Sequence, residues 1–412
     1  MAKIDHRSPL APARFPDLPP VTGARFATLA AGIRYRDRDD LLLIELAPGS
    51  TVAGVFTRST TAGHPVVWGR QILPAGRARA VIVNSGNANV FRGAEGDAAV
   101  QAEAQSVAAA LGCRPDEVFA ASTGVIGERL PVERITARVD DLVAGLRADG
   151  IAAAARAIMT TDTFPKGAHA SCTIDGALVT IAGIAKGSGM IAPDMATMLS
   201  FVVTDASVPA PILQELLSEA TDASFNAITV DSDSSTSDTL LLFATGAAGN
   251  AVPAGHDDPR LAGFREALNT VLLDLAHQVV RDGEGAQKFI AVTVDGAVDA
   301  SSARRIGLAI ANSPLVKTAI AGGDANWGRV IMAVGKSGEP VEMARLGVAF
   351  GGHDVARDGS AVLDLDEAPV AAHLAGSEIA IRVVVGDGPG SATVWTCDLT
   401  HGYIDINADY RS

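Results

Sequence analysis

One stretch near the middle of the chain most constrains its fold. Residues 186–201 read Lys-Gly-Ser-Gly-Met-Ile-Ala-Pro-Asp-Met-Ala-Thr-Met-Leu-Ser-Phe, so a small residue, Ala196, directly precedes a hydroxyl residue, Thr197. A glycine-containing segment leads into this pair, and an apolar run typical of a strand, residues 198–204, follows it. The pattern predicts an irregular loop that enters a sheet at Thr197, in a chain that cuts itself between Ala196 and Thr197.

Self-cleavage would supply what an internal threonine lacks, since its hydroxyl needs a nearby base to act as a nucleophile. The hydroxyl attacks the preceding carbonyl, the peptide becomes an ester, and water releases Thr197 with a free α-amino group. Such an amine has a pKa of roughly 7.7–8.0, which suits proton transfer near neutral pH. A single threonine is far more often an ordinary strand residue. It is the whole stretch, and not this threonine alone, that favours an acyl-transfer enzyme made of two fragments.

Apolar runs alternate with helical patterns along the chain and predict a mixed α/β (α+β) fold. Residues 172–175 and 177–185 predict a hairpin, because Asp175-Gly176 suits a tight turn whose two central residues have positive φ. Strands are expected at residues 41–46, 52–57 and 80–84, helices over the apolar stripes at 100–111, 135–146, 212–220 and 264–279, and a surface loop at 246–258.

Composition excludes several classes of protein. The 412 residues are 48% hydrophobic, which supplies a large core, and the formal net charge of −14 argues against nucleic acid or an anionic membrane as the main partner. Three scattered cysteines are too few for a disulfide framework or a metal site. The polar, proline-rich N-terminus is unlike a signal peptide, and no apolar run reaches the ~18–20 residues of a membrane span, so we expect a cytoplasmic protein.

The central stretch closely resembles the signature of the ornithine acetyltransferase family, the glutamate N-acetyltransferases of arginine biosynthesis. The resemblance covers essentially the full length, and the order and spacing of its segments make it specific. Further matching segments are residues 54–57, 83–89, 122–127, 159–163, 224–226, 282–286, 312–318, 326–329 and 406–412.

The resemblance implies roles for individual residues. Thr197 is similar to the family's nucleophile, and Thr123 and Gly124 match its oxyanion hole, a hydroxyl and a backbone N–H. Substrate-binding positions are matched by Thr163, Lys186, Thr197, Glu284, Asn407 and Ser412. Lys186 suits a substrate carboxylate and Glu284 a protonated amine such as that of ornithine. Without the resemblance, a segment like residues 122–124 would more often form a plain turn. Lys186 and Glu284 would more often be charged residues on the surface, and Ser412 would more often belong to a frayed C-terminal tail.

The resemblance also implies an αββα sandwich with an additional α/β region. Fragments 1–196 and 197–412 would form one folding unit and assemble as an α2β2 heterotetramer. The implied reaction moves acetyl from N²-acetylornithine to glutamate through an acetylated Thr197. No metal or cofactor is expected, and it stays open whether acetyl-CoA also serves as an acetyl donor.

Two other functions remain open from the sequence. With the same nucleophile and water as the acceptor, the chain would be an N-terminal-nucleophile amidase or aminopeptidase. The acidic segment 230–239 superficially suggests a calcium loop and hence a non-catalytic metal-binding or polyanion-binding protein. That segment lacks the glycine and the closing glutamate of a calcium loop, and its serines at 232 and 237 depart from the family pattern, as does Val90-Phe91.

Overall fold

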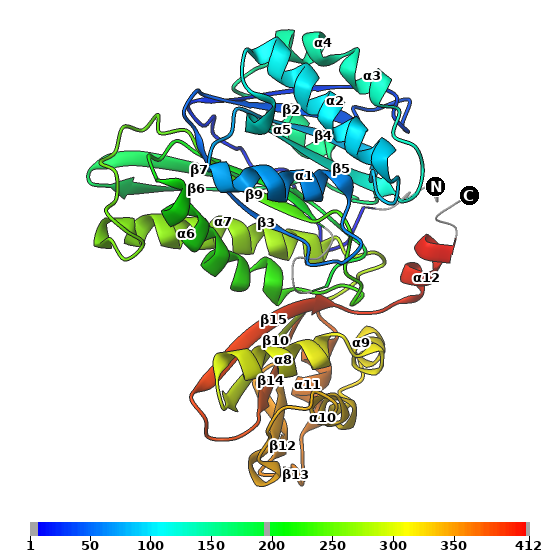
Figure 1. Ribbon diagram of the computed structural model, residues 1–412. Coiled ribbons are helices and arrows are strands. Elements are labelled where there is room, and N and C mark those ends of the chain that lie inside the picture. Colours follow the sequence, from blue (N-terminus) through cyan, green and yellow to red (C-terminus); the bar gives the residue numbers. More distant parts are fainter. Residues whose placement is uncertain (1–6, 193–197, 409–412) are drawn as a thin grey trace.

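Two β-sheets lie face to face in the larger part of the molecule (Figure 1). The computed structural model describes residues 7–192 and 198–408. One sheet has four strands, in the order β1 (Ala24–Leu29), β2 (Leu41–Leu46), β4 (Ala80–Asn87) and β5 (Val118–Val125). The other has five, in the order β3 (Thr51–Phe56), β9 (Thr239–Ala244), β8 (Leu199–Thr204), β7 (Ala177–Lys186) and β6 (Lys166–Ile174).

The core between the sheets explains why several strands are continuous apolar runs. Phe119 of β5 and Phe243 of β9 meet edge to face across it, with ring centroids 6.4 Å apart. All six residues of β8 are buried, as are all eight of β4. Strands that are covered on both faces need no alternation of apolar and polar residues, so residues 80–83 of β4 and 201–203 of β8 are continuous apolar runs.

Helices cover the two outer faces. The helices α2 (Ala94–Leu111), α3 (Val132–Thr136) and α4 (Val139–Ala144) pack on the four-stranded sheet, whereas α6 (Ala210–Asp222) and α7 (Ala262–Arg281) pack on the five-stranded sheet (Figure 1). Two further helices, α1 (His64–Ile72) and α5 (Ile151–Ala157), contribute to the core between the sheets. The αββα sandwich expected from the sequence is confirmed.

The predicted single helix over residues 135–146 is wrong, although its apolar stripe is right. Ile135, Val139 and Leu142 are buried as expected, but they belong to two short helices, α3 and α4. Arg138 separates them with φ −112° and ψ 3°, outside the helical range, while the hydroxyl of Thr136 donates to the carbonyl of Val132. The apolar stripe alone does not reveal this break.

The predicted hairpin is confirmed as β6 and β7. Asp175 and Gly176 have φ of 51° and 81°, both in the left-handed region that this type of two-residue turn requires. The two strands pair in register from Ile174↔Ala177 to Lys166↔Ala185. The long hairpin therefore places Lys186, the first residue of the central stretch, at the end of a fixed strand.

The additional α/β region is a six-stranded sheet with its own core. Its strand order is β13 (Ser360–Ala361), β12 (His353–Arg357), β11 (Gly347–Phe350), β14 (Glu378–Val384), β10 (Phe289–Ala297) and β15 (Gly390–Cys397). Around it lie α8 (Ala300–Ala311), α9 (Pro314–Ala321), α10 (Trp327–Gly335) and α11 (Glu367–Leu374). The helix α12 (His401–Ala408) follows β15, and short 3₁₀ turns span Leu73–Ala75, Pro115–Glu117, Phe225–Ala227, Pro259–Leu261 and Met343–Arg345.

The five-stranded sheet joins both sides of the expected cleavage site. Strand β8, which follows the site, pairs antiparallel with β7, which precedes it, and parallel with β9. Strand β9 in turn pairs with β3, from the first part of the chain. Fragments 1–196 and 197–412 would thus share one sheet after a cut. Their boundary stays a prediction, because residues 193–197 lie outside the described part of the chain.

Two expectations concern the environment of the protein. Within residues 7–192 and 198–408, no helix combines the length and the apolar character needed to cross a membrane. The three cysteines are free thiols, with Cys397 buried and Cys113 and Cys172 partly buried. The cytoplasmic location stays a prediction.

A buried charged cluster, Lys166 with Asp162 and Asp282, links β6 to the end of α7. Lys166 Nζ lies 2.7 Å from Asp162 Oδ1 and 2.6 Å from Asp282 Oδ2, and all three side chains are fully buried. Burial disfavours the lysine charge, but the two carboxylates outweigh it and raise the pKa of Lys166. The cluster thus binds a residue of the second expected fragment to two residues of the first.

Replacing Lys166 should show how much this cluster contributes to the stability of the fold. We expect Lys166→Met to lower the free energy of unfolding by about 3–5 kcal/mol, because it leaves two buried carboxylates without their cation. Urea unfolding followed by circular dichroism measures the loss. Lys336→Met, at an exposed lysine, is the matched control and should leave the midpoint unchanged. A loss below about 1 kcal/mol for Lys166→Met would contradict the assigned role.

Candidate active site

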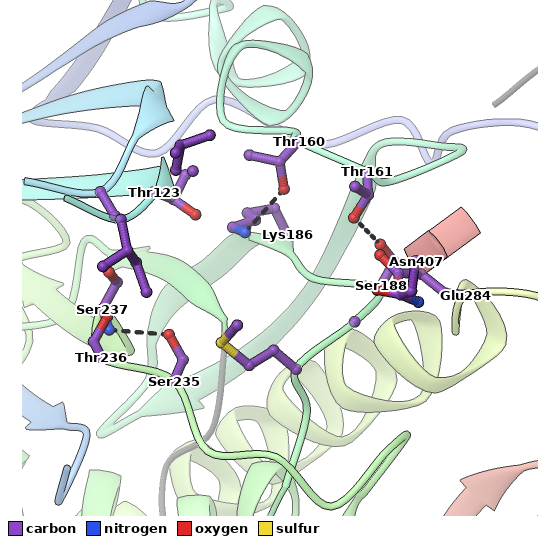
Figure 2. Close-up of a pocket in the computed structure, with 16 residues that line it drawn as sticks. Thr123, Thr160, Thr161, Lys186, Ser188, Ser235, Thr236, Ser237, Glu284 and Asn407 are labelled. Carbon is purple, nitrogen blue, oxygen red and sulfur yellow. Dashed lines mark hydrogen bonds between the residues drawn. The ribbon is translucent and has the colours of Figure 1, made fainter. Parts of the chain in front are cut away.

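A cavity of about 360 Å³ lies where β5 and β7 end (Figure 2). Its wall combines residues from both sheets, from the segment before β9 and from α12. Five residues given a role by the family resemblance line it: Thr123, Gly124, Lys186, Glu284 and Asn407. These positions are up to 284 residues apart in the chain, so the fold brings them together.

Thr123 and Gly124 lie near the end of strand β5 and not in a turn. Gly124 has φ 134°, and a Cβ atom there would lie 2.3 Å from the carbonyl carbon of Gly86 on the neighbouring strand β4. The parallel ladder between the two strands is irregular at Gly86 and Asn87. The close approach of the two backbones therefore demands glycine at 124 and fixes the direction of its peptide at the cavity wall.

Lys186 is buried at the end of β7, and its Nζ donates to Thr160 Oγ1 at 3.2 Å. Burial lowers the pKa of this lysine, although the carboxylates of Asp162, Asp238 and Glu284 oppose that effect. An ammonium group has three N–H donors, and in the described structure this buried one donates to a single neutral hydroxyl, so it can form further hydrogen bonds. Lys186 is therefore suited to receive an anionic group from a ligand.

Glu284 and Asn407 form the opposite part of the wall (Figure 2). Asn407 Nδ2 donates to Glu284 Oε2 at 2.8 Å and to the carbonyl of Tyr403 at 3.0 Å. Burial raises the pKa of Glu284, and the hydrogen bond from Asn407 opposes the shift. A Cβ at Gly189 would lie 2.4 Å from Glu284 Oε2, so the glycine leaves the room that this carboxylate occupies. A cationic ligand in the cavity would therefore stabilise the charged form of this carboxylate.

The helix α12 reaches the cavity because the preceding residues are tied down. Thr400 Oγ1 donates to the carbonyl of Gly285 at 2.7 Å, and Tyr403 Oη donates to Asp231 Oδ2 at 3.3 Å. Gly285 has φ 76°, and a Cβ there would meet the backbone N of Tyr403 at 2.4 Å. These contacts fix the helix that carries Asn407.

The remaining predicted residues are Thr163 and three that the structure does not describe. Thr163 is not among the described residues that line the cavity; its N–H donates to Asp282 Oδ2 at 2.9 Å and its hydroxyl donates to Asp282 Oδ1. The same hydroxyl accepts from the N–H of Ser8 at 2.9 Å, so it is committed to the buried charged cluster. Ala196, Thr197 and Ser412 lie outside the described residues. The roles predicted for all four stay predictions.

The model of the ArgJ family matches residues 25–412, nearly the whole chain. The chain belongs to the ArgJ family. Over 412 residues it is 58% identical to the arginine biosynthesis bifunctional protein ArgJ of Gluconobacter oxydans, covering 100% of this chain and 97% of that one. The protein of the same name from Agrobacterium fabrum is 55% identical over 408 residues, covering 98% and 99%. The family predicted from the sequence is confirmed, and so is the expectation of an enzyme of arginine biosynthesis.

One solved structure shows a further likeness. It is that of the arginine biosynthesis bifunctional protein ArgJ of Bacillus halodurans, 42% identical, with a TM-score of 0.50. The match covers 52% of the present chain but 99% of the solved one. The solved polypeptide is therefore about half as long as this ArgJ family member.

Sequence reasoning missed a set of hydroxyl groups in the cavity wall. Thr161 Oγ1 and Ser188 Oγ are hydrogen-bonded at 2.7 Å beside Glu284. Further hydroxyls in the wall belong to Thr160, Ser235, Thr236 and Ser237. The sequence does contain features that point to these hydroxyl residues, since residues 159–163 match the family and residues 230–239 are rich in serine and threonine. The second segment was interpreted only as a possible calcium loop.

Asp231 shows what that acidic segment does. Its carboxylate accepts the N–H groups of Met190 at 2.6 Å and Ile191 at 2.8 Å, and that of Asp233 at 3.3 Å. The carboxylate thus fixes the residues that lead towards the expected cut. Among residues 7–192 and 198–408, no group of three or more His, Cys, Asp or Glu could hold a metal ion. The segment is part of the cavity wall.

Adding one methyl group at Gly124 should damage the site. We expect Gly124→Ala to lower the melting temperature and abolish acyl transfer, since the new Cβ collides with the Gly86 backbone. Gly127→Ala is the matched control, because Gly127 also has positive φ (84°) but nothing within 4 Å of its added Cβ. Differential scanning fluorimetry and an activity assay measure both variants. Equal losses in the two would show that φ, and not the close approach, constrains position 124.

Proposed function

We propose that this protein is a self-processing acetyltransferase that moves acetyl from N²-acetylornithine to glutamate and produces ornithine and N-acetylglutamate. The observation that carries the proposal is the cavity wall, which combines Thr123 and Gly124 with Lys186 and Glu284. Membership of the ArgJ family supports the same assignment. The proposed reaction needs a nucleophile beside this wall, and Thr197 is the candidate.

The connectivity of β8 supports Thr197 as that nucleophile. Leu199, near the start of the strand, pairs with the cavity residue Lys186. Thr197 precedes Leu199 by two residues in the sequence. In the sequence, the proposed nucleophile thus stands just before a strand that pairs with the wall of the cavity.

The proposed transfer proceeds in two matching halves. The Thr197 hydroxyl adds to the acetyl carbonyl while its own α-amine takes the hydroxyl proton. The Thr123 hydroxyl and the Gly124 N–H stabilise the oxyanion, a contribution of about 10²–10³ in rate for each donor. The C–N bond then breaks, the amine returns the proton, and ornithine leaves. Glutamate's amine attacks the acetyl ester in the same way, which restores the free threonine.

The charges of the wall suit amino-acid substrates. The Glu284 carboxylate would bind the ammonium group of ornithine, and the Lys186 ammonium would bind a substrate carboxylate. Asn407 would hold Glu284 in place, as it does through its 2.8 Å hydrogen bond. No bound cofactor is needed for these steps. The word "bifunctional" in the names of the relatives supports acetyl-CoA as a second acetyl donor.

The proposal includes a two-fragment subunit, residues 1–196 and 197–412, assembled as an α2β2 heterotetramer in the cytoplasm. The half-length polypeptide solved for the Bacillus halodurans relative supports processing into two chains. The shared five-stranded sheet would hold the fragments together, since strands from both take part in it. The buried contact of Lys166 with Asp282 adds a second link.

Mass spectrometry of the purified protein tests the nucleophile. We expect two fragments that meet between Ala196 and Thr197, and an acetyl adduct on the peptide beginning with Thr197 after incubation with N²-acetylornithine. Thr197→Ala should give one intact chain without activity, because it lacks the attacking hydroxyl. Thr180→Ala on β7, partly exposed, is the control and should be cut normally. An active but uncut wild-type protein would refute the proposal.

Isotope exchange separates the transferase from an amidase with the same nucleophile. Labelled ornithine should enter N²-acetylornithine without net loss of acetyl, because the acetyl-enzyme waits for an amine. Net release of acetate without exchange would show that water is the acceptor.

The charge of Glu284 should control the binding of the cationic substrate. Because burial holds its pKa above the ordinary 4.5, ornithine affinity should fall as the pH drops through that raised pKa and the carboxylate is protonated. Glu284→Gln should weaken binding by about 10–100-fold and remove this pH dependence. Calorimetric titration with ornithine between pH 5 and 8 measures both effects. Glu266→Gln, at an exposed glutamate of α7, should bind as the wild type does; unchanged affinity in Glu284→Gln would contradict the role.

A further inference from the structure

The hydroxyl groups of Thr161 and Ser188 are linked to Glu284, although the proposed transfer reaction gives them no role. Thr161 Oγ1 lies 2.7 Å from Ser188 Oγ, and both residues line the cavity (Figure 2). The Thr161 hydroxyl also forms a hydrogen bond with the Glu284 carboxylate. Ser188 is 2% exposed and Glu284 is 8% exposed, so the three side chains meet largely out of contact with solvent.

The protons available to these groups fix the direction of the hydrogen bonds. An ionised carboxylate can only accept, and a hydroxyl has one proton to donate. With Glu284 ionised, Thr161 therefore donates its proton to the carboxylate, and Ser188 is the donor between the two hydroxyls. The result is a hydroxyl relay from Ser188 through Thr161 to Glu284, in which each hydrogen bond polarises the next.

The backbone holds both ends of the hydroxyl relay in place. The N–H of Glu284 donates to the carbonyl of Ser188 at 2.9 Å, so the first residue of the relay also binds the main chain of the last. Thr161 stands between Thr160 and Asp162 in the chain, and the N–H of Thr160 donates to Asp162 Oδ2 at 2.9 Å. Asp162 is fixed in turn by the buried charged cluster. The relay therefore connects two segments that the fold has already positioned.

The groups around Glu284 act on its ionised state in opposite directions. Burial is the largest influence on the pKa of this carboxyl and raises it, and the carboxylates of Asp231 and Asp162 add to the rise. The hydrogen bonds from Asn407 and Thr161 lower the pKa. Protonation of the oxygen that accepts from Thr161 would remove the acceptor of the relay. The relay therefore opposes protonation.

Lys186 and Tyr403 are further ionisable groups near Glu284. Burial lowers the pKa of Lys186, and the charge of Glu284 is one of those that oppose this shift. Burial raises the pKa of Tyr403, and the charges of Asp231 and Glu284 add to the rise, so the phenol stays neutral between pH 6 and 8. Lys186 loses its charge as the pH rises, whereas Glu284 loses its charge as the pH falls. The two titrations therefore change ligand binding with opposite sign.

We propose that Thr161 and Ser188 are positioning residues of the substrate site, whose hydroxyls hold the Glu284 carboxylate in place and in its ionised form for the ammonium group of ornithine. This inference rests on the proposed function. The relay acts through Glu284 and needs no contact of its own with the substrate. Its contribution is greatest at low pH, where Glu284 is closest to taking up a proton.

The substitution Thr161→Val separates this role from a structural one. Valine has the shape of threonine but no hydroxyl, so Glu284 loses a hydrogen bond and takes up a proton at higher pH than in the wild type. We expect ornithine affinity close to that of the wild type at pH 8 and about 10-fold below it at pH 6. Calorimetric titration with ornithine at both pH values measures the two ratios. A threonine needed only for the fold would change the affinity by the same factor at both, and that result would overturn the inference.

Thr28→Val is the matched control. Thr28 is a partly buried residue of β1 whose hydroxyl donates to Asp39 Oδ2 at 2.5 Å, so the variant also removes a threonine hydroxyl from a carboxylate, but outside the cavity wall. It should bind ornithine as the wild type does at both pH values. Thr161→Ser keeps the hydroxyl and should restore the wild-type ratio. If Thr161→Val instead matches the Thr28→Val control at pH 6, the inference is wrong.

Ser188→Ala covers the case in which Thr161→Val does not fold. It should lower the affinity at pH 6 more than at pH 8, but less than Thr161→Val, because Thr161 keeps its hydrogen bond to Glu284 and loses only the donor that polarises it. Wild-type affinity at both pH values, or an equal loss at both, would overturn the inference and leave the proposed acetyl transfer untouched. A wild-type protein that binds ornithine at neither pH would instead refute the proposed function, and this inference with it.

Discussion

The site depends on the buried pairing of Lys166 with two carboxylates. Asp162 Oδ1 also accepts the N–H of Gly187 at 2.6 Å, and its Oδ2 accepts that of Thr160 at 2.9 Å. Asp282 lies two residues before Glu284. One set of charges thus anchors the residue after Lys186, its hydroxyl partner Thr160 and the turn that carries Glu284. Since desolvation costs several kcal/mol for each ion, the arrangement is stable only when complete.

The ladders around β8 explain how the chain would keep its fold after the proposed cut at its centre. Strand β8 would begin at the second residue after the new terminus, yet both its neighbours in the sheet are fixed by ladders, to β7 on one side and β9 on the other. Its side chains are buried between two layers. The proposed cut before this strand would remove one covalent bond and no described packing contact, so catalysis would gain a free amine at small structural cost.

Local chemistry was predictable from the sequence, whereas long-range pairing was not. The hairpin turn followed from Asp175-Gly176 because two adjacent residues decide it, and the β strands followed from continuous apolar runs. The break between α3 and α4 at Arg138 leaves the apolar stripe intact, so the stripe does not predict it. Thr163 forms hydrogen bonds with Asp282 and Ser8, at 119 and 155 residues' separation, which no local pattern predicts; its role in substrate binding stays a prediction. Only the family resemblance joined Glu284 to Asn407.

The opposite pKa shifts of Lys186 and Glu284 have one common consequence. Burial lowers the pKa of the lysine and raises that of the glutamate, because it makes the charged form of each group less stable. An amino acid brings a carboxylate to the first and an ammonium to the second, and each contact relieves the desolvation that caused the shift. A ligand with one charge relieves only one of them. The cavity therefore favours zwitterionic substrates, because the fold itself only partly compensates the charges of Lys186 and Glu284.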